Sequence, residues 1–468
     1  MITTQNPHTK TNKPVSVNHT LINRLSERTL LTDLYQLTML AGYHDAKIRE
    51  EEATFDLFVR KIPKDWGYLI ANGIEDAIDY ATHLKFTEDD ISYLREQGLF
   101  KEQFLTYLKD FRFTGDIHAV LEGTPVFANE PILRVTARRS EAQFLETLLL
   151  NTINFQTMIA SKASRVVNAA GDAKVVDFGL RRAQEADAGM TGARAAYIAG
   201  AAGTSNVLAG KEYGIPIAGT MAHSFVMSFP KEIDSFRSYV STFPDKATLL
   251  IDTYDTVQGA KNAVIVAKKL EENGHRLRAV RLDSGDLCTL STQVRNILDI
   301  AGFGYVKILA SNDLNEYKIA ELRKNGARID GYGVGTEMIT AKPEAAISGV
   351  YKLVEDTSGA KIKLSSGKKT YPGRKQVYRV FSGETYDHDV LALEDEHIAG
   401  APLLEAIVRD GERVVERRPL EEIRNYSLRS VARLPERVKE LSAGQYALDI
   451  SPKLSKLANT LTEHYGGA

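Results

Sequence analysis

Residues 277–336 read LRAVRLDSGDLCTLSTQVRNILDIAGFGYVKILASNDLNEYKIAELRKNGARIDGYGVGT. Short apolar runs in this stretch alternate with longer segments whose apolar residues recur at helical spacing. Because a chain that returns to a parallel strand needs a crossover, and a helix usually supplies it, this alternation predicts repeated strand–helix units and a parallel sheet. The expected strands are Leu277–Leu282, Val306–Ala310 and Ile329–Val334, and the expected helices are Leu287–Ala301 and Leu314–Asn325.

The same alternation extends upstream and predicts a βα domain over residues 141–348, with its sheet open or closed into a barrel. A long amphipathic helix is expected to open this domain at Ser140 and Glu141, with apolar residues at helical spacing as far as Ile159. Further strands are expected at Lys174–Phe178, Ile215–Gly219 and Thr248–Ile251, and further helices at Ala186–Gly210 and Val257–Asn273.

Two flanking domains are predicted, an α+β domain over residues 1–140 and a C-terminal domain over residues 349–468. We expect the C-terminal strands to form antiparallel sheet outside the barrel, and this domain to pack back on the N-terminal one. The N-terminal elements are a helix near Asp33–Tyr43, an alternating strand at Ala53–Val59 and strands within Gly115–Ala137. The C-terminal elements are strands at Val350–Val354, Lys361–Leu364 and Val377–Phe381 and a helical tail at Glu421–Leu441.

The composition excludes several classes of function. The chain has 468 residues and a formal net charge of −2, which gives no electrostatic reason to expect a nucleic acid or membrane partner. Cys288 is the only cysteine, so we expect neither a disulfide nor a cysteine-based zinc site. Residues 1–25 are polar, and Met1–Lys13 lacks the apolar core of a signal peptide. These features predict a cytoplasmic protein.

Polar and charged residues follow each predicted parallel strand, and the carboxyl ends of barrel strands are where catalytic groups gather. Helix capping is an alternative explanation for any single Asp in these loops, since helices prefer Asp, Ser or Asn at their N-caps. Helix capping explains less well why all six loops after the predicted strands carry polar and charged residues. The segments are Asp177-Phe178-Gly179-Leu180-Arg181-Arg182, Gly219-Thr220-Met221-Ala222-His223-Ser224, Asp252-Thr253-Tyr254-Asp255, Arg281-Leu282-Asp283-Ser284-Gly285-Asp286, Ser311-Asn312-Asp313 and Gly331-Tyr332-Gly333-Val334-Gly335-Thr336.

Several of these residues have a chemical interpretation and a structural alternative. Gly333, Gly335 and Thr336 offer backbone N–H groups and a hydroxyl for a phosphate, although a plain tight turn has the same composition. Asp252 and Asp283 are suited to bind ribose hydroxyls.

Three other residues in these loops have competing interpretations. Arg281 is suited to a diphosphate or a carboxylate, and a salt bridge to one of the aspartates at the strand ends is its alternative. His223 is either a catalytic or a structural histidine. Phe178 is either a stacking platform for an aromatic ring or part of the core.

The motifs at 177–182, 219–224, 281–286 and 333–336 resemble those of the nicotinate phosphoribosyltransferase family and occur in the same order. Leu31-Thr32-Asp33-Leu34-Tyr35 is similar to the opening of that family, and the likeness runs from about residue 30 to 385. The resemblance implies a type II phosphoribosyltransferase with a funnel-like, irregular and incomplete βα barrel. It also implies a homodimer with shared active sites.

The resemblance further implies the reaction and the roles of single residues. Nicotinate and 5-phosphoribosyl 1-diphosphate would give nicotinate mononucleotide and diphosphate in NAD salvage, coupled to ATP and dependent on Mg²⁺. His223 matches the histidine that ATP phosphorylates. The matched binding residues are Phe178, which stacks on the pyridine ring, Thr220, Arg281 and the partner subunit's Tyr35 as nicotinate contacts, and Thr336 as a phosphoribosyl contact.

The nearest alternatives are related enzymes. The nicotinamide enzyme has the same architecture, but it typically carries Gly where this chain has Arg182. Arg181, Arg182 and Arg281 are the candidates for recognising a carboxylate. The quinolinate enzyme shares the fold and lacks the phosphorylated histidine. A βα-barrel aldolase or hydrolase with His223 as its base and a sugar-phosphate sensor without turnover are more remote alternatives.

Overall fold

The computed structural model describes residues 2–3, 28–365 and 370–466. Most of the N-terminal segment that the sequence marks as polar and free of a signal peptide therefore lies outside the described residues. The chain divides into two compact units. The first contains Ile159–Ala345 and is called the barrel unit. The second combines the described residues from 28 to Met158 with those from Ala346 onward and is called the sheet unit.

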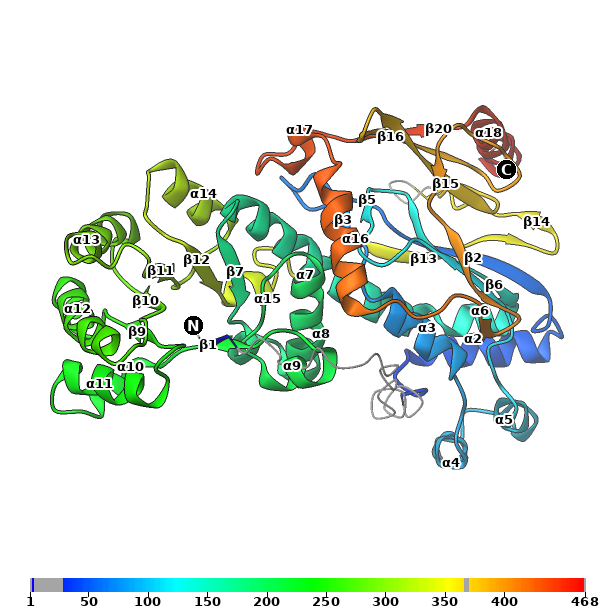
Figure 1. Ribbon diagram of the computed structural model, residues 1–468. Helices are drawn as coiled ribbons and strands as arrows, with labels where there is room; N and C mark the ends of the chain where they lie inside the picture. The colour runs from blue at the N-terminus through cyan, green and yellow to red at the C-terminus, as the bar shows by residue number, and fades with distance from the viewer. Residues whose placement is uncertain (1, 4–27, 366–369, 467–468) are drawn as a thin grey trace. The chain divides into compact units, whose positions relative to one another are not determined.

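The barrel unit is built on a five-stranded parallel sheet in the order β7-β12-β11-β10-β9, with helices along the outer side of the strands (Figure 1). The expected strand–helix alternation is present, and each strand is a residue or more shorter than predicted. The strands are β7 (Lys174–Asp177), β9 (Thr248–Leu250), β10 (Ala279–Leu282), β11 (Lys307–Ala310) and β12 (Gly331–Val334). The helices are η1 (Leu180–Arg182), α8 (Glu185–Ile198), α9 (Val207–Tyr213), α10 (His223–Met227), α11 (Glu232–Thr242), α12 (Thr256–Glu272), α13 (Leu287–Ile300), α14 (Glu316–Lys324) and α15 (Thr336–Ile339).

The barrel is incomplete and continues from β7 through a single bridging residue. Thr204 forms parallel bridges with Asp177 on one side and Ile217 on the other. The neighbouring strand β8 (Ala218–Gly219) does not pair with β9 within the described residues, and a hydrogen bond from Thr220 Oγ1 to the Thr248 carbonyl, 2.9 Å long, spans this seam. A short strand, β1 (Ile2–Thr3), pairs antiparallel with β8. The irregular, incomplete barrel is therefore confirmed.

The predicted helix at Ala186–Gly210 is wrong, because the chain leaves the helix after Ile198 and re-enters one only at Val207. The intervening segment forms the bridges at Thr204. A Cβ on Gly203 would lie 2.4 Å from the Pro216 carbonyl oxygen, so this close backbone approach requires glycine. The expected strand at Ile215–Gly219 is reduced to β8.

The interior of the barrel is apolar, and a buried ion cluster lies at its edge. Val176, Ala218, Ala279 and Leu309 form the interior cluster, and Phe178 packs against it. Outside the strands, Glu316 at the start of α14 is held by two cations of the long helix α7 (Glu146–Ala170). Lys162 Nζ lies 2.5 Å from one Glu316 oxygen and Arg165 Nε 3.2 Å from the other.

The sheet unit contains a seven-stranded antiparallel sheet in the order β14-β13-β2-β6-β4-β18-β19, in which the three N-terminal strands lie between two pairs of C-terminal strands. A four-stranded sheet, β17-β15-β16-β20, and the pair β3-β5 complete it. Its N-terminal strands are β2 (Glu52–Val59), β3 (Leu69–Ile70), β4 (Asp116–Ala119), β5 (Pro125–Val126) and β6 (Pro131–Arg138). Its C-terminal strands are β13 (Gly349–Asp356), β14 (Gly359–Ala360), β15 (Lys375–Ser382), β16 (Thr385–Leu393), β17 (Ala401–Pro402), β18 (Glu405–Arg409), β19 (Glu412–Arg413) and β20 (Ala447–Ile450).

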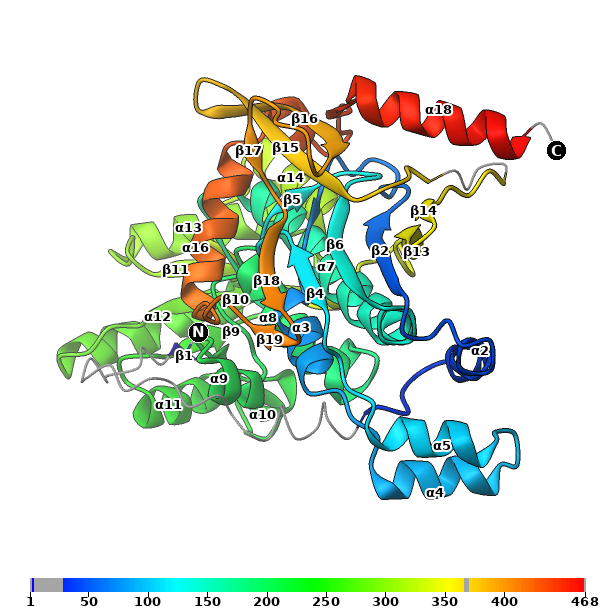
Figure 2. The same ribbon diagram turned by 90° about the vertical axis from the view of Figure 1, so that its right-hand side faces the viewer.

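Helices surround these sheets, and α4 lies beside α5 as a hairpin (Figure 2). The helices are α2 (Leu34–Asp45), α3 (Ile74–Thr82), α4 (Glu88–Glu96), α5 (Glu102–Lys109), α6 (Arg139–Phe144), α16 (Leu420–Ala432), α17 (Glu436–Lys439) and α18 (Pro452–Gly466). Within the described residues, we find no helix with the length and apolar character that spanning a membrane requires.

Three local predictions in this unit need correction. The long helix expected from Ser140 is two helices, since α6 ends at Phe144 and α7 starts at Glu146. Lys361–Leu364 is not a strand, and β14 ends before it. The tail expected as one helix at Glu421–Leu441 is divided between α16 and α17, where Pro435 caps the second helix.

The alternation of apolar and polar residues at Ala53–Val59 does not arise because one face of the strand meets solvent. All of these residues are buried. The polar residue Asp56 is compensated inside the protein by Lys375, whose Nζ lies 2.8 Å from its carboxylate. The alternation therefore reflects a buried ion pair.

Candidate functional site

The ends of the parallel strands bring together most of the residues that the sequence singles out. Because parallel strands end at a common edge, the loops after β8, β9, β10 and β11 meet there. His223 begins α10, Asp252 follows β9, and Asp283 follows β10. Contacts between these side chains define the site.

His223 is contacted at both ring nitrogens. Its Nδ1 lies 3.1 Å from Thr253 Oγ1, and its Nε2 lies 3.5 Å from Asp283 Oδ2. The side chain of His223 is 38% exposed, so the ring is held at the edge of the barrel and still open to a substrate. This arrangement suits a nucleophile or a proton carrier better than a core histidine.

Asp283 and Asp252 are organised by a network of hydrogen bonds. Asp283 accepts a hydrogen bond from the Ser311 hydroxyl. Asp252 Oδ2 accepts from the Asp283 backbone N–H and from the Ser284 hydroxyl, both at 2.7 Å. Asp252 is buried, and its Oδ1 has no hydrogen-bond partner among the described residues. One oxygen of Asp252 therefore fixes the loop, and the other is free for a ligand.

Arg281 lies beside these carboxylates without a close salt bridge. Its Nη2 is 3.8 Å from Asp283 Oδ2, while its Nη1 donates to the Met221 carbonyl at 3.2 Å. Burial lowers the pKa of Arg281, and the neighbouring cation Arg181 acts in the same direction against Asp283 and Asp252. Its Nε is buried without a partner in the described part of the chain. The guanidinium thus keeps donors available for an anion.

The ring of Phe178 explains why glycine is needed at position 333, one of the residues that the sequence suggests for a phosphate site. A Cβ on Gly333 would lie 2.4 Å from the Phe178 ring, so the missing side chain of Gly333 makes room for that ring. Phe178 is half-buried, which leaves part of it available for stacking. Gly335 and Thr336 follow β12 and are both partly exposed. The proposed phosphate contact stays a prediction for them.

The remaining predicted residues do not take part in the contacts around His223, Asp252 and Asp283 that are described above. Thr220 already donates its hydroxyl proton across the seam to Thr248. Arg181 and Arg182 form η1 directly after the strand end at Phe178 and are exposed. Tyr35 belongs to the sheet unit, where it lies on α2 and is 46% exposed. Burial and the nearby Glu146 and Asp33 raise the pKa of Tyr35.

Four further residues contribute to the site and were not assigned roles from the sequence. Thr253 contacts His223, and Ser311 contacts Asp283. Asp177 is buried, accepts from the Gly179 N–H at 2.8 Å and from the Thr204 hydroxyl at 2.7 Å, and burial raises its pKa. Thr253, Ser311 and Asp177 lie in the quoted strand-end motifs, so their position was a usable signal. Thr204 was hidden inside the wrongly predicted helix.

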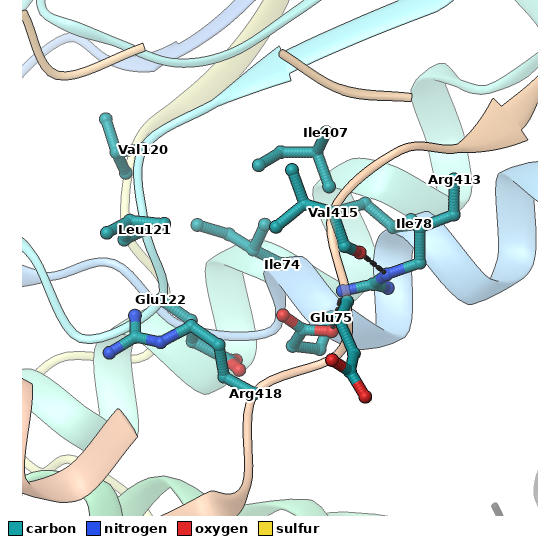
Figure 3. A pocket seen from close by; sticks show the side chains of 11 residues that line it. Ile74, Glu75, Ile78, Val120, Leu121, Glu122, Ile407, Arg413, Val415 and Arg418 are labelled. Carbon is teal, nitrogen blue, oxygen red and sulfur yellow. Dashed lines mark hydrogen bonds and ion pairs between the residues drawn. The ribbon is translucent and has the colours of Figure 1, made fainter. Parts of the chain in front are cut away.

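A separate small pocket lies in the sheet unit (Figure 3). Its volume is about 10 Å³, which is about the smallest space that holds one water molecule. Glu75 and Arg413 approach each other on one side, with Arg413 Nη2 2.6 Å from the Glu75 carboxylate. The pocket is too small for a substrate.

The fold and the strand-end cluster together define a class of protein. An incomplete βα barrel that presents a histidine, carboxylates and a partly unsatisfied arginine at the carboxyl ends of its strands is an enzyme scaffold for an anionic substrate. Comparison with known proteins then narrows this class.

Three domain families match the chain, the nicotinate phosphoribosyltransferase N-terminal domain at residues 30–154, the nicotinate phosphoribosyltransferase family at 173–369 and its C-terminal domain at 399–458. Nicotinate phosphoribosyltransferase pncB2 of Mycobacterium tuberculosis is 43% identical over 90% of this chain and 91% of its own length. Nicotinate phosphoribosyltransferase of Bacillus subtilis is 46% identical over 79% and 77%. The crystal structure of human nicotinic acid phosphoribosyltransferase is similar with a TM-score of 0.83, 28% identity and 92% and 99% coverage.

The chain therefore belongs to the nicotinate phosphoribosyltransferase family. It is an enzyme of NAD salvage that transfers a phosphoribosyl group to nicotinate, and the resemblance inferred from its strand-end motifs is confirmed.

Proposed function

We propose that the enzyme couples phosphoribosyl transfer to ATP hydrolysis through phosphorylation of His223. The observation that carries this proposal is the placement of His223, which is partly exposed and contacted at both nitrogens by Thr253 and Asp283. A neutral imidazole is nucleophilic near pH 7, and a carboxylate at one nitrogen stabilises the charge that forms when the other reacts.

We propose that the same strand ends position nicotinate and 5-phosphoribosyl 1-diphosphate. Displacement of diphosphate from the ribose builds positive charge on the sugar and negative charge on the leaving oxygens. Arg281 is half-buried and its Nε has no partner in the described residues. Its positive charge stabilises the leaving diphosphate. Phe178 stacks on the pyridine ring, and Arg181, Arg182 and Thr220 serve the nicotinate carboxylate. Gly333, Gly335 and Thr336 serve the phosphoribosyl phosphate.

Mg²⁺ is proposed to enter with the diphosphate and with ATP. Among the described residues, His, Cys, Asp and Glu do not gather in groups of three or more that would hold a metal ion. Asp252 is suited to supply a single ligand to Mg²⁺, which prefers oxygen ligands. Its Oδ1 is buried at the strand ends and has no hydrogen-bond partner in the described chain. When bound, Mg²⁺ neutralises charge on the leaving diphosphate.

The oligomer and the compartment complete the proposal. We infer a homodimer in which Tyr35 of one subunit reaches the strand-end site of the other. The exposure of Tyr35, 46% on a helix where tyrosine is more often core, supports a role in contact with another molecule. The near-neutral composition and single cysteine support a cytoplasmic enzyme.

A product assay tests this function. The full-length protein is incubated with nicotinate, 5-phosphoribosyl 1-diphosphate and Mg²⁺, with and without ATP, and the products are identified by mass spectrometry. Nicotinate mononucleotide and diphosphate are expected, with faster formation and release of ADP when ATP is present. A reaction that proceeds equally with and without ATP, and releases no ADP, contradicts the coupling.

A further inference from the structure

Thr253 is the part of the histidine environment to which neither the motifs nor the proposed reaction gives a role. It follows Asp252 in the loop between β9 and α12, and its Oγ1 lies 3.1 Å from His223 Nδ1. The loop is fixed on both sides of Thr253. Asp252 Oδ2 accepts two hydrogen bonds from residues 283 and 284, and Asp255 caps α12 by accepting from the Gln258 N–H at 2.7 Å.

We propose that Thr253 is a positioning residue for the phosphoryl relay, holding His223 in one ring orientation and one tautomer. This inference rests on the proposed phosphorylation of His223. A carboxylate accepts hydrogen bonds, so we assign the proton of the neutral imidazole to Nε2, which faces Asp283 at 3.5 Å. The lone pair is then on Nδ1, and the Thr253 hydroxyl donates to it.

Asp283 cannot supply this orientation alone. Its contact with His223 Nε2 is long for a hydrogen bond, and its other oxygen is committed to the Ser311 hydroxyl. The Thr253 contact is the shorter of the two on the ring. Loss of the Thr253 hydroxyl therefore leaves the ring free to turn about its side-chain bonds.

The phosphoryl step uses the nitrogen that Thr253 faces. The Nδ1 lone pair attacks the γ-phosphorus of ATP, the bond from that phosphorus to the bridging oxygen breaks, and ADP leaves with the electron pair. The proton on Nε2 stays in place and faces Asp283, which compensates the positive charge on the phosphorylated ring. The Thr253 hydroxyl gives up its hydrogen bond to Nδ1 as the new bond to phosphorus forms.

The test compares Thr253→Val, which keeps the shape and removes the hydroxyl, with Thr253→Ser, which keeps the hydroxyl. Phosphoenzyme is measured by rapid quench with γ-labelled ATP and by phosphorus NMR of the histidine, beside mononucleotide formation without ATP. Loss of one hydrogen bond predicts a slowing of phosphoenzyme formation in Thr253→Val of about five- to tenfold. ATP-independent product formation should stay within about twofold, and Thr253→Ser should recover most of the phosphorylation rate.

Thr242→Val is the matched control, since Thr242 is exposed at the end of α11 and its hydroxyl donates to the Ser238 carbonyl. Equal phosphorylation rates in Thr253→Val and wild type overturn the inference. Equal loss of phosphorylation and of ATP-independent turnover, or no recovery in Thr253→Ser, also overturns it in favour of general support of the site. Absence of phosphoenzyme in the wild-type protein contradicts the proposed function itself, and the inference falls with it.

Discussion

At the scale of single residues, the types of side chain at the strand ends were predictable and their pairings were not. The motifs placed His223, Arg281 and Asp283 near one edge because parallel strands end together. They did not show that Asp252 accepts a hydrogen bond from the backbone of Asp283. Almost every residue carries a backbone N–H, so the sequence does not reveal which one Asp252 contacts. Contacts such as Thr253 with His223 arise from loop conformations that no spacing rule specifies.

His223→Ala is expected to abolish nicotinate-dependent ATP hydrolysis and to leave slow, ATP-independent formation of nicotinate mononucleotide. The reason is that, in the proposed reaction, His223 relays the phosphoryl group, whereas Arg281 and the other strand-end residues bind the substrates. ADP release and mononucleotide formation are measured on the same purified protein. ATP hydrolysis at the wild-type rate in His223→Ala would show that another group accepts the phosphoryl.

Nicotinate is expected to be strongly preferred over nicotinamide. The proposed carboxylate pocket consists of Thr220 and one or more of Arg181, Arg182 and Arg281, and Arg181 is close enough to Arg281 to lower its pKa. A neutral amide leaves the positive charge of the pocket unpaired at a cost of about 3–5 kcal/mol. That cost corresponds to a drop in kcat/KM of at least about a hundredfold. Similar kcat/KM values for the acid and the amide, measured side by side, would refute this assignment of the pocket.

At the scale of elements, apolar periodicity predicted the strands well and failed where backbone packing decides the structure. The sheet strands β7 to β12 lie within the predicted apolar runs, since a buried parallel strand must be apolar on both faces. The segment between α8 and α9 also continues an apolar pattern. It contains Gly200-Ala201-Ala202-Gly203-Thr204, whose glycines were the signal for a break. Its pairing with residues before and after it is a long-range contact that local propensity does not contain.

Gly203→Ala is expected to destabilise the barrel unit, because the new Cβ meets the Pro216 carbonyl oxygen at 2.4 Å. The backbone must shift, at a cost of about 1–3 kcal/mol, and the Thr204 bridges to its neighbours weaken. Chemical denaturation measures the loss. Gly42→Ala on α2, where a Cβ meets nothing within 4 Å, is the control and should not destabilise. An unchanged free energy of unfolding in Gly203→Ala would mean that this approach of the chains is not tight.

At the scale of the whole molecule, the sheet unit joins distant parts of the sequence. β13 pairs with β2 and β18 pairs with β4, so segments from both ends of the chain share one sheet. The sequence indicated strands at both ends, but strand partners depend on register and topology rather than on composition. The same unit carries Tyr35, whereas the barrel unit carries Arg281. In the proposed dimer, the Tyr35 and the Arg281 that serve one site come from different subunits.

The proposed shared site predicts complementation between two inactive variants. Tyr35→Ala and Arg281→Ala homodimers should each be nearly inactive, because every site lacks one of the two side chains. After dissociation and mixing, a heterodimer has one site with both defects and one with neither. Random reassociation makes about half of the dimers mixed, so activity should recover to roughly a quarter of the wild-type value.

Recovery is measured as the rate of nicotinate mononucleotide formation against the mixing ratio of the two variants, with subunit exchange followed independently by native mass spectrometry of differently tagged chains. Mixing either variant with itself is the control and should give no recovery. If Tyr35 acts within its own subunit, one site of the heterodimer lacks Tyr35 and the other lacks Arg281. Both sites are then inactive. Complete exchange without recovery would therefore place Tyr35 in its own chain's site or outside any site, whereas recovery near a quarter can arise only if the two side chains come from different subunits.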